Sequence, residues 1–161
     1  MEDAIVRRKW KYTPIPATRW SVESRLQHPS NGTACFGAMP EVVHAGRTIF
    51  AGGDIVLRYG RHTGSRFSQN GFGFRHIWAR RFHHVAEHGE AMDAVCEFVA
   101  GILRPGAHVY WETGRRVAIF CNANGEVIVE ERGTAERPFY SIVTAIRHPV
   151  KPKGSRLGAL G

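Results

Sequence analysis

The 161 residues suffice for one domain with a hydrophobic core, since 43% of them are hydrophobic. The chain has 22 Lys and Arg against 14 Asp and Glu, a formal net charge of +8. This excess favours a polyanionic partner, with nucleic acid first and an acidic protein second. No apolar run is long enough to span a bilayer, and residues 1–5 contain no signal-peptide hydrophobic region. We therefore expect no membrane span, whereas the detached end of a larger secreted protein stays open.

The cysteines and histidines predict no metal centre. Cys35, Cys96 and Cys121 contain no CxxC pair, and an odd, scattered set argues against a disulfide framework and a zinc knuckle. His84 and His88 stand four residues apart, a spacing that suits zinc on a helix, but no obvious third ligand accompanies them. We therefore expect no metal ion and no other cofactor.

Residues 1–45 lack a regular pattern, because four prolines and several Ser, Thr and Gly residues interrupt any hydrophobic period. Trp10 and Trp20 argue against complete disorder of this segment. We expect an irregular N-terminal arm or linker remnant over residues 1–45. A folded domain follows over 46–150, and a basic tail over 151–161.

The domain is expected to begin with strands and a helix. Two β-prone segments between residues 48 and 59 are separated by two glycines, and a polar loop is expected over 61–70. Beyond the loop, apolar residues recur at helical spacing: Phe74, Ile77, Trp78 and Phe82. On the opposite side of this helix, one turn apart, fall His76, Arg80 and His83.

The second half of the chain predicts one long helix and then strands. An apolar stripe runs through residues 90–103: Met92, Val95, Cys96, Val99, Ile102 and Leu103. β-Prone segments follow at 108–111, 117–121, 126–129 and 139–146, with an Asn-Gly turn before the third. Helices that precede an antiparallel sheet predict an α+β fold.

The stretch 60–80 concentrates imidazole, guanidinium, glycine and aromatic groups. Imidazole exchanges protons near neutral pH, guanidinium binds phosphate oxygens in pairs, and glycine lets a backbone approach a ligand. Together these groups favour a site that handles a phosphodiester. The alternative is a glycine-rich loop leading into an amphipathic helix whose polar face is merely solvated.

The last predicted strand adds hydroxyl groups. Tyr140, Ile142 and Thr144 are expected on one face of this strand, and Ser141 and Val143 on the other. The Thr144 hydroxyl is a candidate ligand for a phosphate oxygen. The alternative is that threonine serves only the strand, where it is common.

The run Tyr59-Gly60-x-His62-x-Gly64, followed by the segment 71–78, resembles the toxin-type nucleases of the barnase, EndoU, colicin and RelE superfamily. Segments 109–112 and 140–145 extend the resemblance, which covers about residues 46–148. Such domains occur at the C-termini of contact-dependent inhibition and polymorphic toxins and as phage-associated nucleases. Where similar sequences continue with Glu-His, this chain has Arg80-Arg81-Phe82-His83, which leaves a role for His83 open.

The resemblance implies N-terminal helices packed on a four- to five-stranded antiparallel sheet, barnase/EndoU/RelE-like, and RNA cleavage without a metal. The 2′-hydroxyl attacks the adjacent phosphorus while imidazoles act as general base and acid. We expect four catalytic residues: His76, His62, Thr144 and Arg116. Substrate binding is expected from a second set: Arg61, Arg75, Arg80, Tyr140 and Ser141.

The expected partners are RNA, with tRNA as one candidate, and an acidic cognate immunity protein, the chain being otherwise a monomer. The resemblance implies delivery from a secreted or surface toxin into the cytoplasm of a target cell. Three other functions stay open. One is an NAD-consuming ADP-ribosyltransferase that uses residues such as Glu112. The others are a non-catalytic RNA-binding module and a phage structural domain.

Overall fold

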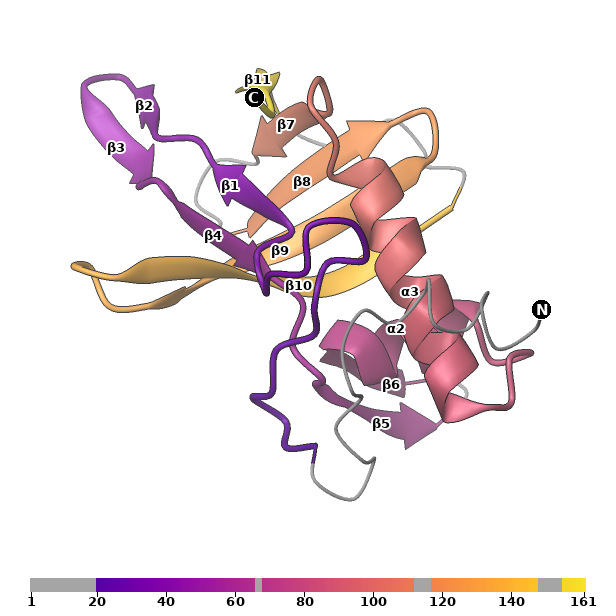
Figure 1. The fold of residues 1–161 in the computed structure, drawn as a ribbon. Helices are drawn as coiled ribbons and strands as arrows, with labels where there is room; N and C mark the ends of the chain where they lie inside the picture. The colour runs from indigo at the N-terminus through magenta and orange to yellow at the C-terminus, as the bar shows by residue number, and fades with distance from the viewer. Residues whose placement is uncertain (1–19, 66–67, 112–116, 148–154) are drawn as a thin grey trace.

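The computed structural model describes residues 20–65, 68–111, 117–147 and 155–161, which form a mostly β structure with two helices (Figure 1). The strands are β1 (Gly37–Met39), β2 (Val42–His44), β3 (Arg47–Phe50), β4 (Gly53–Val56), β5 (Arg61–Ser65), β6 (Ser68–Phe72), β7 (His108–Trp111), β8 (Val117–Asn122), β9 (Gly125–Gly133), β10 (Pro138–Ile146) and β11 (Ser155–Ala159). The helices are α2 (Gly73–Arg81) and α3 (His88–Ile102).

Seven of these strands form one sheet in the order β1-β4-β10-β9-β8-β7-β11. β10 is an interior strand of this sheet: it pairs antiparallel with β9 and parallel with β4. The hairpin β2–β3 stands away from one end of the sheet, whereas the hairpin β5–β6 lies beside α2 (Figure 1). The sheet therefore joins the first and last parts of the domain through β4 and β10.

The predicted arrangement of N-terminal helices on a four- to five-stranded antiparallel sheet is wrong. Within the described part of the chain, six strands precede α2, and the main sheet has seven strands and is mixed. The sequence did not reveal these additional strands for two physical reasons. β1 and β2 are three residues long, too short to show alternation, and the β5–β6 hairpin consists largely of polar residues and glycine where a loop was expected.

The core lies between α3 and the inner face of the sheet. The predicted apolar stripe of α3 is confirmed, because all six of its residues are at most 5% exposed. The helix packs on β8 and β9, whose inward side chains are buried: Ala118, Phe120, Val127 and Val129. Burial of each large aliphatic side chain stabilises the fold by about 1.5–3 kcal/mol. α3 and the sheet therefore form a firm support for α2.

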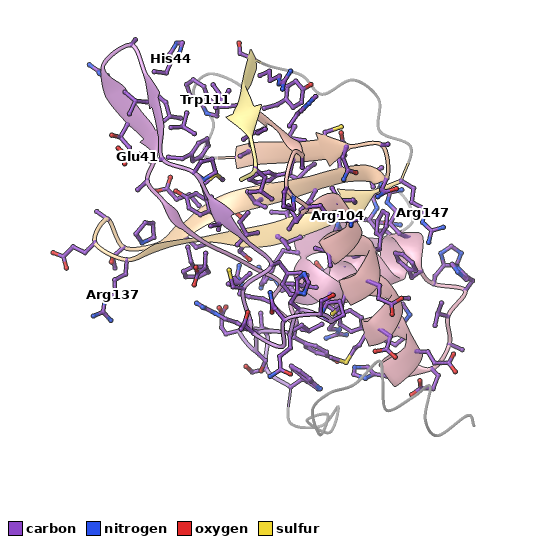
Figure 2. All side chains as sticks on the ribbon, turned by 45° about the horizontal axis from the view of Figure 1, so that its top comes forward. Glu41, His44, Arg104, Trp111, Arg137 and Arg147 are labelled. Carbon is purple, nitrogen blue, oxygen red and sulfur yellow. The ribbon has the colours of Figure 1, made fainter. Side chains whose placement is uncertain are left out.

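Contacts beyond this core tie the helices to the strands that surround them. Arg147, labelled in Figure 2, lies just after β10. Its guanidinium carbon lies 4.9 Å from the ring centre of Phe82 and 5.3 Å from that of Phe98. Such cation–π contacts contribute about 0.5–1 kcal/mol at exposed sites. The segment between α2 and α3 is thus held against the end of the sheet.

Residues on both sides of the expected domain, 46–150, pack into the same core. Leu26, Phe36 and Met39 from the N-terminal segment are 1–2% exposed, and β1 pairs with β4. At the other end, β11 pairs with β7. Neither described helix combines the length and the hydrophobicity that crossing a bilayer requires.

Candidate active site

The segment that leads from β4 to α2 is held by backbone hydrogen bonds. Phe74 N donates to Arg58 O and Arg75 N donates to Tyr59 O, both at 2.9 Å. These bonds use two of the amide groups that the first turn of a helix leaves without intrahelical partners. Gly73 has a φ of +76° and sits against the Arg58 carbonyl, where a side chain would collide with it. The glycine therefore allows β6 to pass directly into α2.

The β5–β6 hairpin brings His62 against α2. His62 pairs with Gly71 in the hairpin, and its Nδ1 lies 2.9 Å from Nδ1 of His76. A Cβ atom at residue 71 would stand 2.9 Å from the same nitrogen of His76, so only glycine leaves room for this contact. We call His62 and His76 the histidine pair.

The two members of the histidine pair differ in exposure. His76 is 4% exposed, whereas His62 is half-buried and lines a pocket. Burial lowers the pKa of His76 from its usual 6.5 to about 4. Nearby charges act in the same direction, namely those of His62, Arg80 and Arg81. His76 is therefore neutral at pH 7.

This contact allows an arrangement of protons in which His62 can act as a base. A hydrogen bond between two ring nitrogens needs one N–H and one lone pair. When neutral His76 accepts through Nδ1, His62 carries its proton on Nδ1, and its Nε2 holds a lone pair. Nε2 of His62 can then take a proton, and the resulting imidazolium keeps its hydrogen bond to His76. The arrangement is suited to a general base held in one tautomer.

Beside His62 lies a pocket of about 380 Å³, which we call the His62 pocket. Its lining residues are His62, Arg75, Trp78, Ala79, His83, Val85 and Ala86. The indole of Trp78 is fixed, because Nε1 donates to Val85 O at 2.8 Å and Phe74 stacks on it at 5.5 Å. The pocket thus combines an imidazole base, a guanidinium and an aromatic wall.

Two residues that the sequence analysis did not assign to the site, Trp78 and His83, line the His62 pocket. Trp78, expected on an apolar face, also packs partly buried against the core. The sequence leaves the role of His83 open. The spacing carried a signal, since Arg75 and Ala79 share one side of α2 and His83 follows four residues later, just beyond the end of the helix. Arg61 and Arg80 are exposed but do not line the pocket.

His76 is expected on the side of its helix opposite the apolar residues, yet the structure buries it. α2 contacts β10 as well as β5 and β6, so His76 is covered from more than one direction. A helical wheel shows only which residues share a side of α2. It cannot show that a hairpin of polar residues covers the side opposite the apolar stripe.

Two predicted substrate-binding residues on β10 are engaged in packing. Tyr140 is fully buried, its hydroxyl donates to Ala51 O at 2.5 Å, and burial raises the pKa of Tyr140 to about 12. Ser141 is 1% exposed and its Oγ accepts a hydrogen bond from Nε of Arg58 at 2.7 Å. Arg116 and Glu112 lie outside the described residues.

Plain alternation predicted that Thr144 shares a face of β10 with Ile142, and this prediction is wrong. Ile142 pairs with Val129 and Thr144 with Ile128, so Val143 is an extra residue in a β-bulge. The bulge moves Thr144 to the face of Ser141. Its Oγ1 is buried and has no hydrogen-bond partner among the described residues.

Replacement of Thr144 by Val is expected to raise the free energy of unfolding by about 1 kcal/mol, because a buried, unpaired hydroxyl carries a desolvation cost. Denaturant unfolding of the two proteins measures this difference. The RNA cleavage rate of the same variant then tests the predicted contact of Thr144 with substrate. An unfolding free energy below that of the wild type contradicts the expectation.

The two histidines considered for zinc separate in the structure. His88 Nε2 lies 3.1 Å from the Tyr59 hydroxyl within an aromatic cluster, and burial lowers the pKa of His88. His84 is exposed and stacks on Phe82. Over the described ranges, no three His, Cys, Asp or Glu side chains gather in a way that could hold a metal ion.

No family model matches the chain, and no curated protein or solved structure does so either. The chemistry of the site is therefore inferred from the histidine pair and the His62 pocket. Both come from the segment 61–86, which contains β5, β6 and α2.

Proposed function

We propose that this protein is a ribonuclease that cleaves RNA by transesterification without a metal ion. The observation that carries the proposal is the 2.9 Å contact between the Nδ1 atoms of His62 and His76, at the edge of a pocket that His62 lines. A neutral, buried imidazole that holds a second imidazole in one tautomer prepares the second for proton abstraction.

In the proposed reaction, Nε2 of His62 removes the proton of a 2′-hydroxyl. The 2′-oxygen then bonds to the adjacent phosphorus, and the bond from phosphorus to the 5′-oxygen breaks. The products are a 2′,3′-cyclic phosphate and a 5′-hydroxyl. His76 touches His62 rather than the pocket, so it acts as a positioning residue.

The pocket also supplies groups that suit a nucleotide. Arg75 is exposed at the pocket, where its guanidinium can bind a phosphate oxygen. Trp78 presents an aromatic surface, and stacking of a base on such a ring contributes about 1–3 kcal/mol in complexes with single strands. The formal charge of +8 adds a long-range attraction for RNA.

The test is incubation of the purified chain with total RNA in EDTA, followed by sequencing of the new ends. We expect cleavage that leaves 2′,3′-cyclic phosphates, and His62→Ala should lower the rate by about 10²-fold or more. His84→Ala is the matched control, because His84 is exposed and does not line the pocket. Cleavage that EDTA abolishes and magnesium or zinc restores excludes the proposal, and NAD turnover in its place supports the transferase alternative.

The toxin-type resemblance leads to a second expectation, an acidic immunity protein that covers the His62 pocket. Exposed arginines lie on the two elements that carry the histidine pair: Arg61 on β5, and Arg75 and Arg80 on α2. Opposite charge accelerates association, so the association rate should fall as salt rises. RNA binding measured with saturating inhibitor is expected to vanish. A ternary complex of chain, inhibitor and RNA contradicts occlusion of the pocket.

A further inference from the structure

The contact within the histidine pair leaves one step of the proposed reaction without a donor. The 5′-oxygen departs as an alkoxide unless it receives a proton. Two imidazoles that touch through Nδ1 lie together, so they do not face opposite sides of the reacting phosphate. His76 is also 4% exposed and does not line the pocket. The proton must therefore come from another group.

The His62 pocket itself narrows the choice. Among its described lining residues, only Arg75, Trp78 and His83 carry side-chain N–H groups besides His62. A guanidinium holds its proton at all ordinary pH values, so Arg75 binds charge but does not donate a proton. The Trp78 N–H is already bonded to Val85 O. His83 is the remaining candidate, and it is exposed at the pocket.

The backbone that carries His83 is held in place by hydrogen bonds on either side. Phe82 N donates to Trp78 O at 3.0 Å, and Val85 N donates to Phe82 O at 2.9 Å. The Trp78 indole then donates to Val85 O at 2.8 Å and closes this turn over α2. His84, the next residue, stacks on Phe82 and does not line the pocket. The turn thus presents only the first of two adjacent imidazoles to the pocket.

We propose that His83 is the general acid of the cleavage reaction, in the pocket that the base His62 also lines. The His83 imidazolium gives its proton to the 5′-oxygen as the bond from phosphorus to that oxygen breaks. His62 gains the proton of the 2′-hydroxyl in the same reaction, so the total charge of the two imidazoles is unchanged. Proton exchange with solvent then returns both imidazoles to their starting protonation states. This assignment rests on the proposed ribonuclease function.

The test uses an RNA oligonucleotide in which a sulfur atom replaces the 5′-oxygen at the mapped cleavage position. A thiolate leaves without a proton, so this substrate does not need a general acid. His83→Ala is expected to slow cleavage of the oxygen substrate by about 10²-fold or more, and to cleave the sulfur substrate at nearly the wild-type rate. His62→Ala should be slow on both substrates, and His84→Ala on neither.

The outcomes separate this inference from the proposed function. If His83→Ala cleaves the RNA as fast as the wild type does, His83 has no part in the mechanism, and the proposed ribonuclease function still holds. A His83→Ala protein that is equally slow on both substrates assigns His83 to substrate binding and overturns its role as the acid. His83→Gln, with an unchanged melting temperature, checks that the loss is not one of folding. No cleavage by the wild type defeats both proposals together.

Discussion

Replacement of His76 by Ala is expected to lower RNA cleavage and stability together. Loss of a large buried side chain costs about 2–5 kcal/mol of unfolding free energy, because a cavity remains. It also removes the ring nitrogen that lies 2.9 Å from Nδ1 of His62 and that accepts its hydrogen bond in the proposed arrangement. Without that bond His62 loses its fixed tautomer, and the cleavage rate should fall by about 10²-fold or more. Denaturant unfolding and single-turnover cleavage measure the two losses.

The variant His76→Asn separates positioning from packing. Its side-chain oxygen can accept the hydrogen bond from Nδ1 of His62, although the amide is smaller than the ring. A hydrogen bond to a charged group contributes about 1.5–3 kcal/mol, so His76→Asn should cleave RNA at least about tenfold faster than His76→Ala. A His76→Ala protein with the wild-type rate removes His76 from the mechanism. Equal rates for the two variants remove its positioning role.

Acidification from pH 7 to pH 4 is expected to lower the contribution of His76 to the unfolding free energy by about 3 kcal/mol. The pKa of His76 is about 4 in the folded state, against 6.5 for an unperturbed ring. Between these values the unfolded chain binds a proton that the folded chain does not. The contribution of His76 to the unfolding free energy is therefore fully present above pH 6.5, and it declines as the pH falls toward 4.

Denaturant unfolding of the wild type and of His76→Asn across pH 4–7 measures this effect. Burial also lowers the pKa of His28 and of His88, so both proteins lose some stability in acid. The difference in unfolding free energy between the two proteins isolates the contribution of His76. This difference should shrink or reverse as the pH falls. Curves that stay parallel over the whole range contradict a depressed pKa at His76.

Segments whose local pattern matched their environment could be predicted. The stripe of α3 is buried, and strands form at the expected segments 108–111, 117–121, 126–129 and 139–146. In α3, β7 and β8 the hydrophobic period coincides with burial on one side, whereas β10 is a mainly apolar segment with buried residues on both faces. The β-bulge at Val143 shows the limit, because one extra residue moved Thr144 to the other face of β10.

The sheet as a whole could not be predicted from local patterns. β4 pairs with β10, more than eighty positions later in the chain, and the pairing is parallel. β1 and β11 join the two edges from segments that we expected to be an arm and a tail. Such pairing depends on which strand edges remain unpaired after the rest of the sheet has formed, a property of the assembled sheet.

The sequence by itself determined the chemical groups of the candidate site, since imidazole, guanidinium and indole stand together in the stretch 60–80. Only the tertiary structure decided their arrangement. His62 and His76 are fourteen positions apart, and their contact depends on the β5–β6 hairpin folding over α2. The same fold buries His76, keeps His62 at the pocket and exposes His83 there. Burial lowers the pKa of His76, so the chemistry of this histidine depends on its position in the fold as well as on its residue type.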